Sequence, residues 1–155
     1  MKTDAKFSDC RKYRYALWRT WDESKPCVMF IGLNPSTANE VDNDSTIIRC
    51  IDYARSWGYG SLCMTNIFAF KATKPTDMFA ASEPIGEEND AWLKSLASQS
   101  ALVVAAWGND GAHLGRSADV KKMLGNLHCL KINATGEPAH PLYQPAKAKP
   151  ILFPI

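Results

Sequence analysis

Several polar residues of this chain could bind a ligand or take part in acid–base chemistry. They are Asn34, Asn66, Asn109 and His140, and each follows an apolar segment that predicts a strand. An amide group offers both a hydrogen-bond donor and an acceptor, whereas an imidazole can accept or release a proton near neutral pH. These residue types therefore indicate either a binding site for a polar ligand or a hydrolytic site.

The first of these groups follows the apolar run Val28–Gly32, which is typical of a buried strand in a parallel sheet. The run ends at Asn34-Pro35, because proline cannot donate to a sheet and holds the preceding residue extended. Asn34, Ser36 and Thr37 are thus presented beyond the carboxyl end of a strand, where open α/β sheets bind their ligands. The alternative is a turn that only connects the strand to the next helix.

A second polar group, formed by Asp44, Thr46 and Arg49, lies a few residues downstream. It could cap a helix and form an ion pair. It could also bind a phosphate or a ribose, with Arg49 as the cation. A hydrolytic alternative combines His140 with Asp42 or Asp44 as base and orienting group.

Strands and helices are predicted to alternate from residue 28 onward. Apolar runs predict strands at 28–32, 61–65, 101–106 and 127–132, and helical spacing predicts helices at 46–57, 87–97 and 117–124, whereas 133–155 is predicted to be irregular. This order implies right-handed βαβ units and an α/β fold, a three-layer α/β/α sandwich with a central, mostly parallel four-stranded sheet. All strand-to-helix loops of such a sheet lie at one edge. The polar residues should therefore converge around one cleft.

The N-terminal segment 1–25 is predicted to form an edge strand or hairpin arm of a single domain that spans residues 1–155. Tyr13–Trp18 alternates in side-chain class and is rich in aromatic residues, as strands often are. The arginines here have two interpretations. They could keep an exposed edge from aggregating, or Arg14 or Arg19 could contact a phosphate.

The composition argues against several classes of protein. The five cysteines are scattered and odd in number, which argues against a disulfide framework, a zinc site or an iron–sulfur cluster. No apolar run is long enough to cross a membrane, and the first six residues lack the apolar core of a secretory signal. A net charge of +2 neither demands nor excludes a nucleic-acid partner. We therefore expect a cytoplasmic protein with no metal and no cofactor.

Four segments resemble motifs of the uracil-DNA glycosylase superfamily, and they occur in the superfamily's order. The resembling segments are Gly32-Leu33-Asn34-Pro35-Ser36 (first motif, in the version of the mismatch-specific thymine/uracil branch), Thr65-Asn66 (base-reading asparagine), Trp107-Gly108 (end of the third strand) and His140-Pro141 (final loop). More narrowly, the chain resembles a bacterial and phage family catalogued as domain of unknown function 1643. That resemblance is carried by Leu33–Ala38, Asp44, Thr46, Arg49, Asn66–Phe70, Ala106–Asn109 and Gly136–Tyr143.

The glycosylase resemblance implies a role for each motif residue. Cleavage of an N-glycosidic bond leaves negative charge on the departing base, and His140 would donate a hydrogen bond to the base oxygen. Asn66 would pair with the N–H and C=O groups of a pyrimidine. Asn34 would hold the attacking water, but its amide cannot take the proton, which implies slow catalysis. Phe68, Phe70 and Tyr143 are the candidates for an aromatic platform. The remaining candidate binding residues are Pro35, Ser36, Thr37, Trp107, Gly108 and Asn109.

The resemblance implies a protein that recognises a nucleobase, a nucleotide or a nucleic acid such as DNA, with N-glycosidase activity if it is an enzyme. A non-catalytic binding module on the same fold and an unrelated small-molecule hydrolase are the alternatives. Leu142-Tyr143-Gln144 stands where DNA-cleaving members carry Ser-Pro and a wedge residue. Entry into a DNA duplex is therefore not implied.

Overall fold

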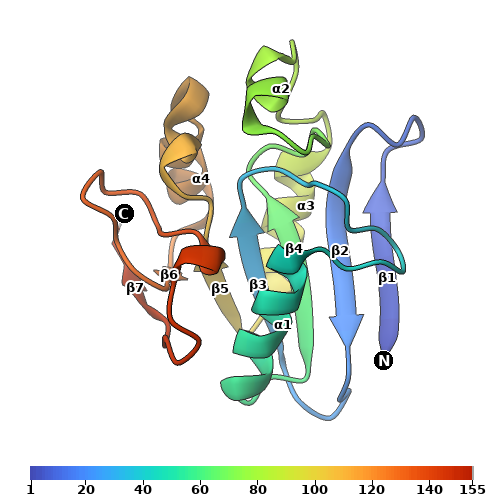
Figure 1. Ribbon diagram of the computed structural model, residues 1–155, viewed down its shortest axis with the longest axis vertical. Helices are drawn as coiled ribbons and strands as arrows, with labels where there is room; N and C mark the ends of the chain where they lie inside the picture. Colours follow the sequence, from blue (N-terminus) through green and yellow to red (C-terminus); the bar gives the residue numbers. More distant parts are fainter. Residues whose placement is uncertain (155) are drawn as a thin grey trace.

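The structure is a computed structural model that describes residues 1–154. These residues form one seven-stranded sheet, in the order β1-β2-β4-β3-β5-β6-β7, and four α-helices (Figure 1). The strands are β1 (Lys2–Phe7), β2 (Arg14–Thr20), β3 (Cys27–Gly32), β4 (Ser61–Asn66), β5 (Leu102–Ala105), β6 (Leu127–Cys129) and β7 (Ile151–Phe153). The helices are α1 (Ser45–Ser56), α2 (Pro75–Ala80), α3 (Asn89–Gln99) and α4 (Arg116–Leu124), with 3-10 helices η1 (Asn109–Gly115) and η2 (Pro141–Tyr143).

The α/β class predicted from the sequence is confirmed, but the predicted four-stranded sheet is wrong. The four predicted strands, β3 to β6, do form a parallel centre in the order β4-β3-β5-β6. The sheet continues on both sides through antiparallel pairs, with β2 and β1 beyond β4 and with β7 beyond β6. Arg14–Trp18 therefore belongs to a hairpin arm, β2, and Tyr13 directly precedes it. Because β1 pairs with the outer side of β2, β2 does not form the edge of the sheet.

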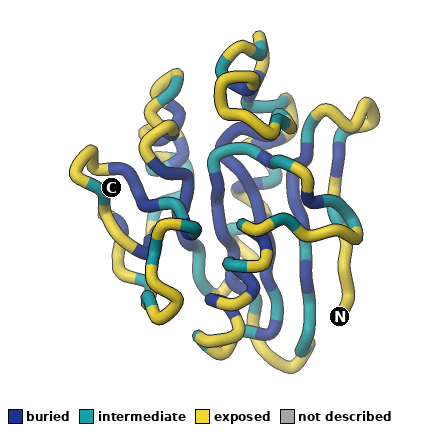
Figure 2. Tube along the Cα trace, in the orientation of Figure 1, coloured by how far each residue is buried: buried dark blue, intermediate teal, exposed yellow. Residues whose placement is uncertain are grey.

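The two edge strands carry little sequence signal. β1 has the sequence KTDAKF and is almost fully exposed, so it lacks an apolar face that could be recognised. β7 has only three residues, two of them exposed, in the segment predicted to be irregular. Figure 2 shows the contrast between the exposed β1 edge and the buried central strands.

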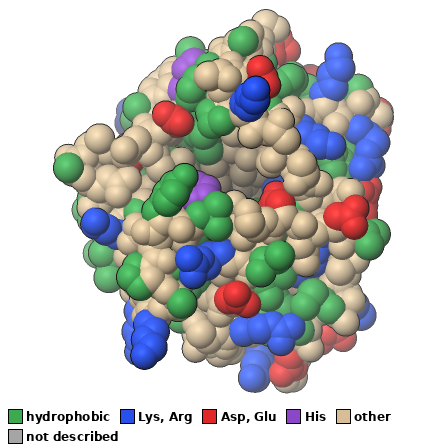
Figure 3. Space-filling view, viewed as in Figure 1, with side chains coloured by type: hydrophobic (Ala, Val, Ile, Leu, Met, Phe, Trp, Pro, Cys, Tyr) green, Lys and Arg blue, Asp and Glu red, His purple; other side chains and the backbone are tan. Residues whose placement is uncertain are grey.

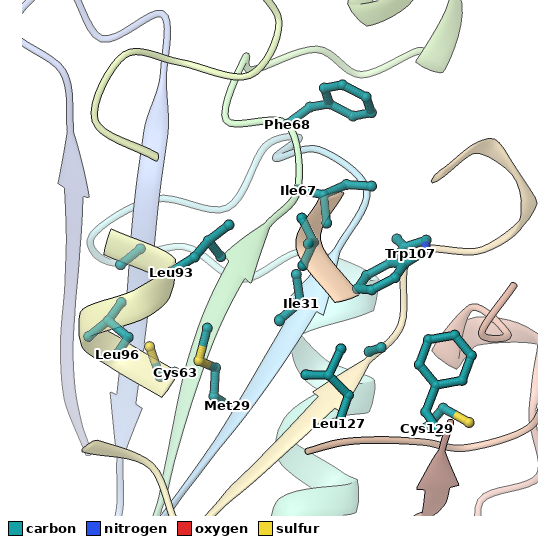
Figure 4. Packing of buried hydrophobic residues seen from close by; sticks show 14 of the residues in the cluster. Met29, Ile31, Cys63, Ile67, Phe68, Leu93, Leu96, Trp107, Leu127 and Cys129 are labelled. Atoms are coloured by element: carbon teal, nitrogen blue, oxygen red, sulfur yellow. The ribbon is translucent and has the colours of Figure 1, made fainter. Parts of the chain in front are cut away.

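The core lies on both faces of the sheet, because successive side chains of a strand point in opposite directions. On β3, Met29 and Ile31 join a cluster that contains the apolar side chains of α3 and α4, part of which is drawn in Figure 4. Val28 and Phe30 join a second cluster with the apolar side of α1. The helices thereby fix the central strands and, with them, the loops at their carboxyl ends.

Helix α1 begins where the sequence predicts it to begin. Asp44 is the N-cap, and its Oδ1 accepts a hydrogen bond of 3.0 Å from the Ile47 amide. Ile47, Cys50 and Ala54 are buried against the sheet. None of the helices in residues 1–154 has the length and apolar character needed to cross a membrane.

Gly111 is required by the packing of Trp107, which is 1% exposed. A Cβ at residue 111 would lie 2.0 Å from Cδ1 of the Trp107 ring, within the η1 segment that follows β5. We expect Gly111→Ala to lower the free energy of unfolding by about 3 kcal/mol, the upper range for overpacking. In thermal unfolding this is a drop in Tm of roughly 6–12 °C for a chain of this size.

Gly58→Ala is the matched control. Its Cβ would meet no atom within 4 Å, although its φ of 87° disfavours alanine. We expect this variant to lose only about 1 kcal/mol. Equal losses in the two variants would contradict the packing described for Trp107.

Candidate functional site

A cavity of about 570 Å³ lies beyond the carboxyl ends of the central parallel strands. Figure 3 shows it as a hollow in the face of the molecule, with a histidine and an acidic side chain at its rim. β4 and β5 lie on opposite sides of β3, so the chain leaves β3 and β5 in opposite directions along the sheet. In α/β sheets, a crevice forms where connections from two adjacent strands run in opposite directions, and ligands bind in it. The candidate residues that line the cavity are Asn34, Pro35, Ser36, Asp44, Thr46, Asn66, Trp107, Gly108, Asn109, His140 and Tyr143.

Four of the candidate residues lie outside the cavity. Thr37 is exposed to solvent, and Arg49 lies over the Tyr53 ring. Phe68 is fully buried in the core, and Phe70 packs edge-on against a tyrosine of the N-terminal hairpin. Neither phenylalanine therefore provides a platform in this cavity. Tyr143 is 82% exposed at the rim, with its ring 5.5 Å from that of His140.

Asn34 offers an acceptor to the cavity. Its Nδ2 donates to the carbonyl oxygens of Ala72 at 2.8 Å and Pro35 at 3.1 Å. Both partners can only accept, so the amide nitrogen must face them. The Oδ1 atom is left without a protein partner among residues 1–154 and can hold a water molecule or a ligand donor.

Asn66, the last residue of β4, is 2% exposed and lies on the floor of the cavity. Its Oδ1 accepts a hydrogen bond of 3.3 Å from Nη2 of Arg14. Gly32 lies beside its Nδ2, and a Cβ at residue 32 would approach that atom to 2.9 Å. The glycine of the first motif thus leaves room for the Asn66 amide group.

Arg14, which the sequence indicates only as a possible phosphate contact, also lines the cavity. It is 2% exposed, and no carboxylate of residues 1–154 lies within ion-pair distance. Burial lowers the pKa of Arg14 to about 10, while the charge of Asp44 acts in the opposite direction, so the guanidinium stays protonated at neutral pH. The protein therefore keeps a positive charge beneath the cavity.

Arg19, the other arginine considered as a phosphate contact, is fully buried and has a structural role. Its guanidinium donates to the carbonyl oxygens of Asn39 and Asp42 and to Oδ1 of Asn43. These bonds hold the polar loop that leads to Asp44. Neither arginine is the exposed, charged edge residue of the first interpretation, because β1 covers β2.

His140 presents a hydrogen-bond donor to the cavity. Its Nδ1 accepts a hydrogen bond of 3.1 Å from the Leu142 amide, so the proton of the neutral ring is on Nε2. Burial lowers the pKa of His140, against a smaller opposite effect of Asp44. The neutral ring with Nε2–H is therefore the form that the fold favours.

Residues that follow β5 hold the loop that carries His140 in place. The Gly108 amide donates to the Pro138 carbonyl oxygen at 2.9 Å. Gly108 has a φ of 75°, a conformation that favours glycine, and a Cβ there would lie 3.8 Å from Cβ of His140. Ser117 of α4 adds a hydrogen bond of 2.6 Å to the Glu137 carboxylate.

The lowered pKa of His140 predicts a pH dependence of stability. His140 binds a proton less readily in the folded chain than in the unfolded chain, where its pKa is about 6.5. The stability associated with the neutral ring is therefore fully present above about pH 6.5, and it is lost as the pH falls below that value. We expect the Tm of the wild type to fall more steeply than that of His140→Gln between about pH 7 and pH 5. Parallel Tm curves for the two proteins would contradict this assignment.

The hydrolytic alternative lacks its base–orienter pair. The His140 ring is oriented by the Leu142 amide, and no hydrogen bond or ion pair joins it to a carboxylate among residues 1–154. Asp42 does not line the cavity, and its carboxylate accepts from Nδ2 of Asn39. Asp44 uses Oδ1 for the helix cap, and its Oδ2 has no protein partner in the described residues.

The family described as "Protein of unknown function (DUF1643)" matches residues 14–142. This range contains Arg14 at its start and His140 near its end, together with every other residue discussed for the cavity except Tyr143 and Gln144. No curated protein gave a significant match. No solved structure gave one either.

Proposed function

We propose that this chain, which belongs to the DUF1643 family of proteins of unknown function as its sequence predicts, binds a nucleobase or a nucleotide. The proposal is based on the residues that line its cavity. We further propose that it acts as a specialised N-glycosidase on DNA or on a modified nucleotide, with a three-layer fold of the uracil-DNA glycosylase type. One observation carries the proposal. The side chains of Asn66, at the end of β4, and His140, in the loop after β6, line one cavity, and their Nδ2–H and Nε2–H groups have no acceptor among residues 1–154.

The polar groups of the cavity suit the edge of a heterocycle. Nδ2 of Asn66 and Nε2 of His140 are donors for carbonyl oxygens, and Oδ1 of Asn34 is an acceptor. The volume lies within the range of small-molecule sites, and it leaves space beside the base for a sugar. Tyr143 at the rim offers an exposed ring that could stack on a neighbouring base.

The same groups can assist cleavage of an N-glycosidic bond. The departing base takes up negative charge, and the His140 Nε2–H bond can stabilise it in a cavity partly shielded from water. Oδ1 of Asn34 can position a water molecule at the anomeric carbon. Asp44 also lines the cavity, and its Oδ2, which has no partner among residues 1–154, can stabilise positive charge on the sugar or accept the proton.

A non-catalytic binding module is the second candidate, and one observation favours it. The asparagine of the first motif has an amide group, which cannot remove a proton from water. If Asp44 does not take this role, the cavity would bind a base without cleaving its bond to the sugar.

The proposal is tested by a thermal-shift panel of nucleobases, nucleotides and short oligonucleotides, followed by analysis of the products for free base and abasic sites. A rise in Tm with pyrimidine ligands supports the proposed binding of a base or nucleotide. Release of free base would in addition support the proposed glycosidase activity. Binding without any product supports the binding module. No shift with any ligand of the panel would refute the proposed function.

A further inference from the structure

The charge of Arg14 is stabilised neither by exposure to solvent nor by an ion pair among residues 1–154. The guanidinium is buried and charged, yet its protein partners are neutral: Nη1 donates to the Ala38 carbonyl oxygen at 3.0 Å and Nη2 donates to Oδ1 of Asn66 at 3.3 Å. Its Nε is buried with no partner in the described residues. Burying a charge without a counter-ion is costly, so such a residue is expected to serve a purpose in the site.

The bond to Asn66 determines which amide atom faces the cavity. A guanidinium can only donate hydrogen bonds, so the amide atom directed at Arg14 must be the oxygen. The nitrogen then points away from Arg14 and lies beside Gly32, where no atom of residues 1–154 accepts a hydrogen bond from it. Asn66 could otherwise rotate by half a turn and present its oxygen to the ligand instead.

We infer that Arg14 is a positioning residue that holds the Asn66 amide with its donor toward the cavity, and that it thereby makes the site select ligand edges carrying a carbonyl group over edges carrying an amino group. This inference rests on the proposed function and assigns it a substrate class. The hydrogen bond to Ala38 keeps the guanidinium in place, and because no carboxylate of residues 1–154 pairs with Arg14, Nη2 is free to bind Asn66.

Three substitutions separate this role from a general role in folding. Arg14→Lys keeps a group that can only donate, so Asn66 should keep its orientation. Arg14→Gln replaces it with an amide that can donate or accept, so Asn66 can turn either way. Arg14→Met fills the space without any polar group. Circular dichroism and Tm report whether each variant is folded, and the comparison of Lys with Gln suffices if the Met variant does not fold.

Binding is measured by calorimetry at neutral pH with two matched pairs of ligands, the monophosphates of uridine and cytidine and those of inosine and adenosine. Within each pair, a carbonyl and a ring N–H are replaced by an amino group and a bare ring nitrogen. We expect the wild type and Arg14→Lys to prefer the carbonyl member of at least one pair by about tenfold or more. The preference should fall to about threefold or less in Arg14→Gln and Arg14→Met.

The outcomes distinguish the two levels of the proposal. Failure of the wild type to bind any of the four nucleotides counts against the proposed function itself. A wild type that binds without preference, or an Arg14→Gln variant that keeps the full preference, overturns the role of Arg14 and leaves nucleotide binding intact. An equal loss of affinity for both members of a pair in every variant would indicate a purely structural role and would also overturn it.

Discussion

Asn66→Asp is expected to weaken the binding of carbonyl-bearing bases about tenfold to hundredfold while the protein stays folded. The substitution replaces Nδ2, the donor beside Gly32, with a carboxylate oxygen that repels a carbonyl group. An unsatisfied or repulsive polar contact in a buried site costs about 1–3 kcal/mol or more, which is roughly a tenfold to hundredfold loss of affinity. The new carboxylate would meanwhile lie beside the guanidinium of Arg14, to which Oδ1 of Asn66 now binds. Arg14 would gain the counter-ion that it lacks, so the Tm should not fall.

Asn126→Asp is the matched control, since it adds the same charge at an exposed residue outside the cavity. Calorimetry with uridine monophosphate and thermal unfolding of both variants check the prediction. Unchanged affinity in Asn66→Asp would show that Asn66 does not contact the ligand. A large fall in its Tm would contradict the described contact with Arg14.

His140→Ala is expected to lower the rate of base release by about 10²–10³, the usual effect of removing one oxyanion donor. The reason is that Nε2–H of His140 stabilises charge that develops only as the bond to the sugar breaks. Affinity for the intact substrate should change much less than the rate. Single-turnover release of uracil from a uracil-containing strand measures the rate, and calorimetry measures the affinity.

His128→Ala controls for the general effect of losing an imidazole, because His128 lies on β6 and does not line the cavity. It should cleave at the wild-type rate. Equal rates for His140→Ala and the wild type would remove His140 from the mechanism. A loss of affinity as large as the loss of rate would instead assign it to substrate binding.

The positions of the four parallel strands along the chain could be predicted from the sequence, because they depend on strong local patterns, whereas their order in the sheet was not predicted. Val28–Gly32 is a continuous apolar run, which suits a strand buried on both faces. Helix α1 combines an N-cap aspartate with apolar residues at helical spacing. The gathering of Asn34, Asn66 and His140 then follows from parallel topology alone, since it needs only the direction of the strands.

The features that the sequence did not predict depend on tertiary contacts. Strand β1 has no apolar pattern, and it pairs with β2 through the backbone. Helix α2 has six residues and begins at Pro75, too short for a helical period to be recognised. The sequence leaves open whether Arg14 lies at an exposed edge or contacts a phosphate, because nothing local indicates that β1 pairs with β2. Phe68 looked available for stacking, but it packs into the core beyond β4.

The central claim is that the loops after β3, β4, β5 and β6 form one pocket for a flat base. A crystal structure of the protein soaked with uridine monophosphate tests it most directly. We predict that the ring binds between Asn66 and His140, with carbonyl oxygens within hydrogen-bond distance of Nδ2 and Nε2 and with Asn34 facing the sugar. A crystal structure in which Asn34 and His140 face away from each other across packed side chains, or in which the nucleotide binds elsewhere, would contradict the account.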